Sequence, residues 1–210
     1  MNKVILAALA AAAVVVPAVT GPALAQSATE LPGRVDPSRV AAGRYTVDTD
    51  HTQVVFTANH FGFTDYVGLI GGATGTLTLD PAKPDTAKVT IDIPLKSVVT
   101  TSSKLNGHLQ TADFFDTKKF PTATFESTEI AAEGNTARIT GNLTLRGVTR
   151  PVVLDARFTG AGVNPMNKAA TVGFSATTTI KRSDFGVSFG LPVVSDEVGL
   201  EIVAAFEKAN

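Results

Sequence analysis

Three side chains between residues 96 and 120 are of the types that a hydrolase uses for nucleophilic catalysis. Ser103, His108 and Asp113 follow one another at intervals of five residues, and such groups form a catalytic triad when a fold aligns them. The chain lacks the G-x-S-x-G turn that would expose Ser103 between a strand and a helix. Because closeness in sequence does not imply triad geometry, we predict that the protein is not an enzyme.

Metal chemistry is also limited by the residues present. The chain has three histidines and no cysteine, whereas zinc needs three or four converging ligands. His51 and His60 are nine residues apart on one extended run and His108 is far from both, so no pair has the spacing of a local metal site. We predict no metal and no cofactor. Disulfides and thiolate nucleophiles are excluded.

The N-terminus has the pattern of a secretory signal peptide. Lys3 precedes a long apolar run, and a small-residue cleavage site ends at Ala25. We therefore expect a signal peptide over 1–25, a flexible Pro/Gly/Ala-rich leader over 26–43 and one domain over 44–210. The predicted location is the periplasm. No later segment is apolar enough to span a bilayer, so we expect no stable membrane insertion.

The charge balance gives no indication of a polyanionic partner. The chain has 18 basic and 19 acidic residues, for a net charge of −1, and it contains no basic run. This composition argues against nucleic-acid binding and gives no basis for attraction to an anionic membrane.

The elements that must position any site are strands, because apolar and polar residues alternate from Tyr45 onward. Alternation predicts one dry and one wet face and hence antiparallel strands, and an even number of them can close without edges. We predict an all-β fold, an antiparallel eight-stranded lipocalin-like barrel with a short helical hook between strands 3 and 4. A two-sheet sandwich remains the alternative. The predicted strands lie within 45–60, 71–80, 87–95, 120–130, 137–147, 151–160, 170–182 and 197–209.

The hook is the long polar connection over 96–120. Ser102 or Ser103 can cap a short helix there, and the adjacent Phe114 and Phe115 would form an apolar wedge on a helical turn. We expect the hook to close one end of the barrel as a plug. The alternative is that both rings simply complete the core.

The predicted barrel lining contains many small side chains, such as Ala58, Gly141 and Ala176. A filled core would use bulkier residues to reach native density, so we favour an apolar cavity. The alternative is that small residues oppose large ones such as Phe158. The predicted ligand-binding residues are Val54, Phe56, Ala58, His60, Ile91, Ile93, Phe114, Phe115, Phe125, Ile139, Leu143, Leu154, Ala156, Phe174, Ala176, Leu200 and Ile202.

Four stretches together resemble the YceI-like family of exported, lipocalin-like proteins associated with polyisoprenoid binding. They are "YTVDTDHTQVVFTANH" (45–60), "HLQTADFFDTKKFPTATFES" (108–127), "GNLTLRGVTRPV" (141–152) and "RSDFGV" (182–187). The chain departs from the family pattern at "GLIGGATG" (68–75) and "LNG" (105–107). The resemblance implies a barrel whose tunnel holds a long isoprenoid or acyl chain, and it implies no catalytic residues.

The sequence thus predicts a periplasmic binding or carrier protein for a long apolar lipid, of the isoprenoid quinone or prenyl pyrophosphate type. A head group would sit at the barrel mouth near basic or histidine side chains, and a homodimer is left open. The alternative is a non-catalytic stress-response accessory with a filled core that binds protein partners through outward residues such as Val55 and Val153. The candidates for the head group are His60, Lys104, His108, Arg146, Arg150 and Arg182.

Overall fold

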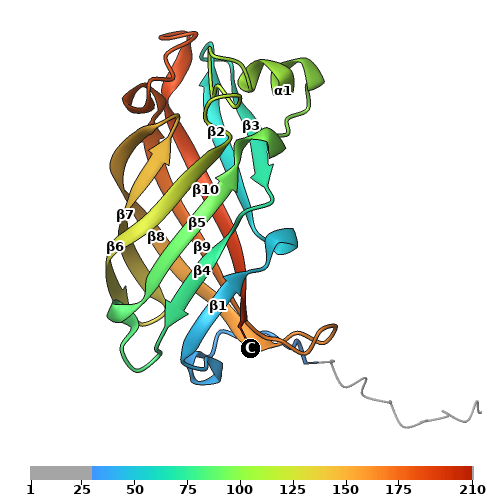
Figure 1. Cartoon of the computed structure of the whole chain (residues 1–210), viewed down its shortest axis with the longest axis vertical. Coiled ribbons are helices and arrows are strands. Elements are labelled where there is room, and N and C mark those ends of the chain that lie inside the picture. Colours follow the sequence, from blue (N-terminus) through green and yellow to red (C-terminus); the bar gives the residue numbers. More distant parts are fainter. Residues whose placement is uncertain (1–29, 210) are drawn as a thin grey trace, which may run out of the picture. The chain divides into compact units, whose positions relative to one another are not determined.

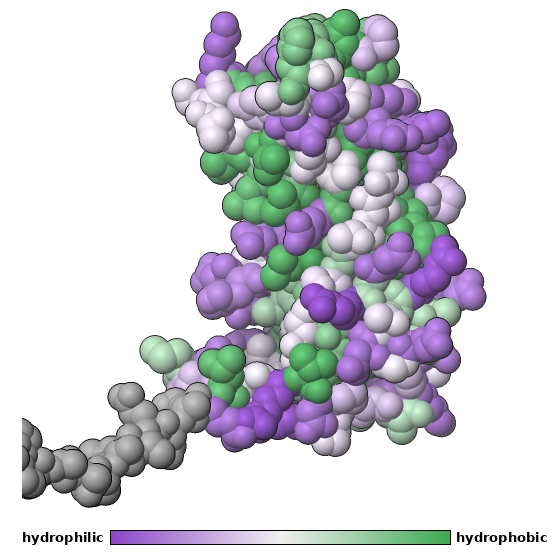
Figure 2. Space-filling model, turned by 180° about the vertical axis from the view of Figure 1, so that it is seen from behind, coloured by the Kyte–Doolittle hydropathy of each residue, from purple (hydrophilic) through white to green (hydrophobic). Residues whose placement is uncertain are grey.

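The alternating segments form long antiparallel strands in the computed structural model, which describes residues 30–209 (Figure 1). The outer surface mixes polar and apolar side chains, as expected where every second residue faces water (Figure 2). The strands are β1 (Gly43–Val47), β2 (Gln53–His60), β3 (Thr64–Gly71), β4 (Thr74–Leu79), β5 (Lys88–Pro94), β6 (Thr122–Glu133), β7 (Thr136–Leu145), β8 (Val148–Val163), β9 (Ala170–Lys181) and β10 (Val194–Lys208).

These strands make a closed barrel of eight strand positions, which confirms the predicted fold class. Strands β4 to β10 pair in succession, and β1 closes the ring by pairing with both β4 and β10. Strand β10 pairs with β1 at Phe206 and with β2 at Ile202. Strands β1 and β2 therefore occupy one position in the wall, and β3 and β4 occupy the next.

Two details differ from the predicted strands. The segment 45–60 is interrupted by a short 3-10 turn, η2 (Thr49–His51), so it forms two strands rather than one. The sequence also gave no expectation of a strand at Thr64–Gly71, where β3 pairs with β2 along its whole length. Two glycines and a charged residue break the alternation of β3, which explains why it escaped the pattern.

The hook lies between β5 and β6, at the upper end of the barrel in Figure 1. It contains α1 (Ser103–Leu109), whose first turn is capped by Ser102, with the Leu105 amide donating to its hydroxyl. Before α1, the backbone of Val99 forms two hydrogen bonds with Leu69 of β3. This pairing covers the edge of β3 that no neighbouring strand covers.

The predicted signal peptide over 1–25 and the first residues of the leader lie outside the described residues. From Leu31 the leader runs along β8, where Arg34 and Ala161 exchange two backbone hydrogen bonds of 3.1 and 2.8 Å. A 3-10 turn, η1 (Pro37–Arg39), leads from there into β1. No helix within residues 30–209 is both long and apolar enough to cross a membrane.

Candidate ligand-binding cavity

The hook end of the barrel is filled by side chains. Leu95, Val98 and Phe185 are almost fully buried there, and Phe114 and Phe115 of the hook pack against the same core cluster. This packing fits both the expected plug and the alternative that the two rings complete the core. At this end, the connections between strands are long enough to supply apolar side chains of their own.

A buried arginine stabilises the second long connection at the hook end, which joins β9 to β10. The Arg182 guanidinium donates four hydrogen bonds to the carbonyl oxygens of Ser195, Val187, Phe189 and Val194, at 2.8 to 3.2 Å. Burial lowers the pKa of Arg182, and the charge of the nearby Asp196 opposes this effect. Arg182 therefore has a structural role, and it is not available for a ligand head group.

Asp196 is tied to the same turn. Its carboxylate accepts hydrogen bonds from the Ser183 hydroxyl at 2.7 Å and from the Ser183 amide at 2.9 Å. These hydrogen bonds, helped by the charge of Arg182, lower the pKa of Asp196. The "RSDFGV" stretch thus folds the connection η5 (Arg182–Phe185) onto the start of β10.

The opposite half of the barrel encloses a cavity of about 290 Å³. Its wall is built from the inward stripes of the strands, as the alternation predicts. The predicted residues that line it are Val54, Ile91, Ile93, Phe125, Ile139, Leu143, Leu154, Ala156, Phe174, Ala176, Leu200 and Ile202.

Five predicted residues do not line this cavity. Phe56 packs into the hook-end core with Phe114 and Phe115, while Ala58 lies near the end of β2. His60 is exposed at the tip of the β2–β3 hairpin, where its ring centroid lies 4.1 Å from that of Phe61 and the two ring planes are tilted by 59°. The inward stripes continue along the whole barrel, but the void does not reach the residues around the hook.

Some of the small lining residues make room for a neighbouring ring and do not enlarge the void. A Cβ atom added at Gly141 would collide with the ring of Phe125, which occupies that space. At this position, the small side chain therefore does not indicate empty space, contrary to the prediction from the sequence. Ala156 and Ala176 differ, because they pair with each other across β8 and β9 and both face the cavity.

An aromatic wall borders the cavity beyond these alanines. Phe158 and Phe174 have ring centroids 5.7 Å apart, and Phe174 lies 6.1 Å from Phe206. Phe158 and Phe206, with Val89 and Ala204, line the cavity but were missing from the predicted site, although they continue the same alternating stripes. The signal that could have included them was already present in the sequence.

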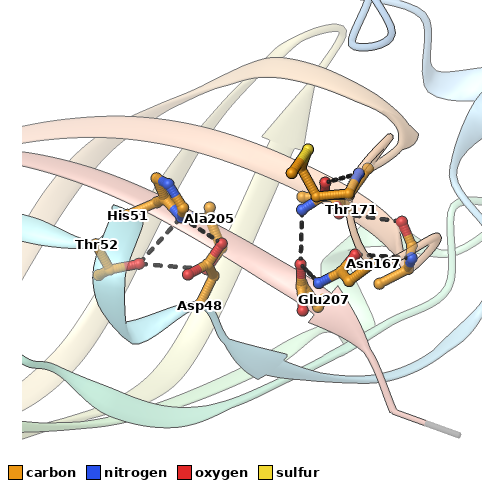
Figure 3. Close-up of polar contacts among 10 residues, drawn as sticks. Asp48, His51, Thr52, Asn167, Thr171, Ala205 and Glu207 are labelled. Carbon is orange, nitrogen blue, oxygen red and sulfur yellow. Dashed lines mark hydrogen bonds and ion pairs between the residues drawn. The ribbon is translucent and has the colours of Figure 1, made fainter.

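The Thr52 hydroxyl, one of the few polar groups in the wall, has its hydrogen bonds satisfied by the backbone. The Thr52 hydroxyl both donates to the Ala205 carbonyl at 3.2 Å and accepts from the Ala205 amide at 3.1 Å (Figure 3). Within residues 30–209, no buried side-chain nitrogen or oxygen lacks a hydrogen-bond partner. Most of the wall is aliphatic or aromatic, so the cavity favours hydrocarbon over a polar ligand.

Tight turns and the leader surround the cavity at the end opposite the hook, which we call the mouth. Pro81 and Pro84 of the β4–β5 connection and Asn135 of the β6–β7 turn line it there. The leader contributes Pro37 and Val40. No periodic signal marks these residues, so the alternation of the sequence could not find them.

The described groups considered for catalysis and metal binding do not converge on one site. His108 and Asp113 are joined at 2.8 Å, but no hydrogen bond links Ser103 to His108. His51 pairs with Asp48 at 2.8 Å near the other end of the barrel (Figure 3). The described part of the chain contains no cluster of three or more metal-ligating side chains.

Comparison with known proteins agrees with this architecture. The family model described as YceI-like domain matches residues 45–206. A UPF0312 protein of Pseudomonas aeruginosa is 39% identical over 161 residues, which cover 76% of this chain and 84% of the relative.

Two solved structures share the fold. BcnA of Burkholderia cenocepacia has a TM-score of 0.67 and 28% identity, covering 76% of this chain and 98% of its own. A polyisoprenoid binding domain from Saccharophagus degradans has a TM-score of 0.59 at 18% identity, covering 80% of this chain and 100% of its own, and this likeness concerns the fold alone. The family match spans the barrel from β1 to β10, and the chain belongs to the YceI-like family.

Proposed function

We propose that this protein binds a long apolar lipid in the barrel cavity and carries it in the periplasm without chemical change. The observation that carries the proposal is the cavity of about 290 Å³, with its nearly continuous wall of aliphatic and aromatic side chains. The family and the solved barrel described as a polyisoprenoid binding domain support an isoprenoid chain as the ligand class.

The cavity size sets how much of a lipid would be enclosed. An apolar cavity of about 150 Å³ can hold benzene, so one of about 290 Å³ has room for roughly twelve carbons, or about two isoprene units. Each buried CH₂ contributes about 0.8 kcal/mol, which offsets the entropy lost by immobilising the chain. A longer lipid would extend through the mouth and keep its polar head outside the barrel.

The direct experiment is to purify the exported protein from its host, extract it with organic solvent and identify the extract by mass spectrometry. We expect a prenyl or acyl lipid at close to one molecule per barrel. If nothing co-purifies and added prenols and fatty acids do not bind, the proposal is wrong.

Ala156→Trp tests whether the cavity is the site of binding. The indole would project into the cavity that Ala156 and Ala176 both face, so we expect loss of lipid binding with a folded barrel. The matched control is Thr177→Trp, because Thr177 neighbours Ala176 on β9 but is exposed on the outer face. Equal loss of binding in both variants would point to a site outside the barrel.

The alternative from the sequence, an accessory that acts through protein partners, requires a filled core. The cavity argues against filling, and the outward Val55 and Val153 are each only partly exposed. If Ala156→Trp lowers stability without affecting any lipid, the filled-core alternative gains support.

A further inference from the structure

Four large apolar side chains are exposed at the mouth end of the barrel. Leu31 and Val35 lie on the leader and are 76% and 57% exposed, and Val163 and Met166 lie at the end of β8 and in the turn that follows, 56% and 89% exposed. We call these four residues the mouth patch. Figure 2 shows hydrophobic surface at this lower end.

The two segments that carry the patch lie side by side. The backbone pairing of Arg34 with Ala161 holds the leader against β8, and the Arg39 guanidinium donates to the Pro32 carbonyl at 3.0 Å. A Cβ atom at Gly162 would collide with the same carbonyl, so glycine is needed for this close approach. Leu31 and Val163 therefore emerge next to one another.

The turn that presents Met166 is held by polar contacts. The Glu207 carboxylate of β10 accepts hydrogen bonds from the Asn164 and Asn167 side-chain amides, at 3.1 and 2.7 Å (Figure 3). The Asn164 side chain in turn accepts from the Met166 amide at 3.0 Å. Because the turn is preorganised, burying Met166 against another surface costs less conformational entropy.

The mouth patch adjoins the entrance to the cavity. Pro37 and Val40, which line the cavity, belong to the same leader as Leu31 and Val35. The opposite end of the barrel is filled by the hook-end core. An apolar ligand that enters at the mouth would therefore meet exposed apolar side chains first and the aromatic wall next.

We propose that the mouth patch docks on the surface of a lipid bilayer, so that lipid passes between bilayer and cavity without crossing water. The direction of transfer rests on the function proposed above, whereas the docking itself rests on the patch. Burial of the four side chains among acyl chains supplies the binding free energy, as in proteins that lie at the membrane interface.

The charge around the patch favours a bilayer as the partner. The segments 31–42 and 163–170 contain three basic residues and one acid, Asp36, and the neighbouring Glu207 carboxylate is held by Asn164 and Asn167. The Asp36 carboxylate already accepts from the Ser38 amide and hydroxyl. A modest positive charge suits anionic lipid head groups.

The test is flotation of the folded barrel with vesicles of phosphatidylethanolamine and phosphatidylglycerol in a 3:1 ratio. The variant Leu31→Ser, Val35→Ser, Val163→Ser, Met166→Ser removes only exposed side chains, so we expect it to fold. Its vesicle partition coefficient should fall by at least about tenfold.

The matched control changes four exposed apolar residues of the hook half to serine and should retain partitioning within about twofold. These residues are Phe63, Val67, Val99 and Val193.

The proposal is overturned if the unmodified barrel does not float with vesicles, if both variants lose binding equally, or if only the hook-half variant loses it. It is also overturned if the mouth variant changes only the oligomeric state measured by light scattering, which would make the patch an interface between two copies. Binding of a soluble short prenol is measured in parallel. Vesicle binding without prenol binding would contradict the proposed function but support docking. Prenol binding without vesicle binding would contradict docking and leave the proposed function standing.

Discussion

The two ends of this barrel are built from the same strands but use their apolar interior differently. At the hook end, Leu95 and Phe185 are each 2% exposed and belong to a packed core. At the mouth end, Phe158 and Phe174 border the cavity. Alternation fixes which side chains point inward at both ends, so the difference must come from what covers each end.

The connections at the two ends differ in what they can contribute. The hook end receives the segments 95–121 and 182–193, which bring Leu95, Phe114 and Phe185 over the interior. The mouth end receives the tight β6–β7 turn, a β4–β5 connection that faces the cavity with Pro81 and Pro84, and the leader with Pro37 and Val40. These three segments contain no phenylalanine to place over the interior, and a cavity remains.

Removing one phenylalanine from each end should give the largest contrast in stability. We expect Phe185→Ala to lower the free energy of unfolding by about 3–5 kcal/mol, because it leaves a new hole in a packed core. Phe174→Ala should lower it by less than about 2 kcal/mol, because one side of its ring already faces empty space. Urea unfolding measures both values. Equal losses would show that the mouth half is packed as tightly as the hook half.

The buried arginine of the hook end should give the next largest effect. Arg182→Met leaves four carbonyl oxygens without a donor, and we expect a loss of about 2–3 kcal/mol. Arg182→Lys should lose nearly as much, because one ammonium cannot reach all four carbonyls. Lipid binding at the mouth end should persist in both variants. If lysine restores full stability, then the charge matters and the hydrogen-bond geometry does not.

Acid should weaken the hook end by a smaller amount through Asp196. The pKa of Asp196 is lowered in the folded protein, so its stabilising effect is present above the ordinary aspartate pKa near 4 and is lost as the pH falls below that value. Solvent screens this partly exposed group, so we expect less than about 1 kcal/mol. The difference in unfolding free energy between the unmodified protein and Asp196→Asn should shrink between about pH 5 and pH 2. A difference that stays constant over this range would contradict the assignment.

The barrel and most of its lining could be predicted because both depend on local alternation. Residues such as Ile139, Leu154 and Ile202 lie in the cavity wall where the pattern places them. Strand β3 escaped because Gly68 leaves its inward space to the Phe56 ring, which takes the place of a side chain. The alternation of apolar and polar residues cannot be seen in the sequence of β3, because an inward position there is filled by a side chain from β2.

The position of the void along the barrel axis could not be predicted. Phe56 and Leu200 are paired neighbours with the same inward orientation, yet Phe56 packs against the hook-end core and Leu200 lines the cavity. Which of the two side chains is packed depends on the position of the hook, and the hook is distant from both in sequence. The leader residues Pro37 and Val40 escaped for the same reason, because they reach the cavity through pairing with β8.

Lipid binding by this barrel requires that hydrocarbon occupy its mouth half. A crystal of the protein soaked with 1-bromododecane would locate the bromine by anomalous scattering, with a chain of about the length that the cavity can hold. We predict one site per barrel, with the chain between Ala156, Phe158 and Phe174 and the bromine at either end of that space. A bromine found only on the outer surface or under the hook, with the space beside Phe174 unoccupied, would contradict the account.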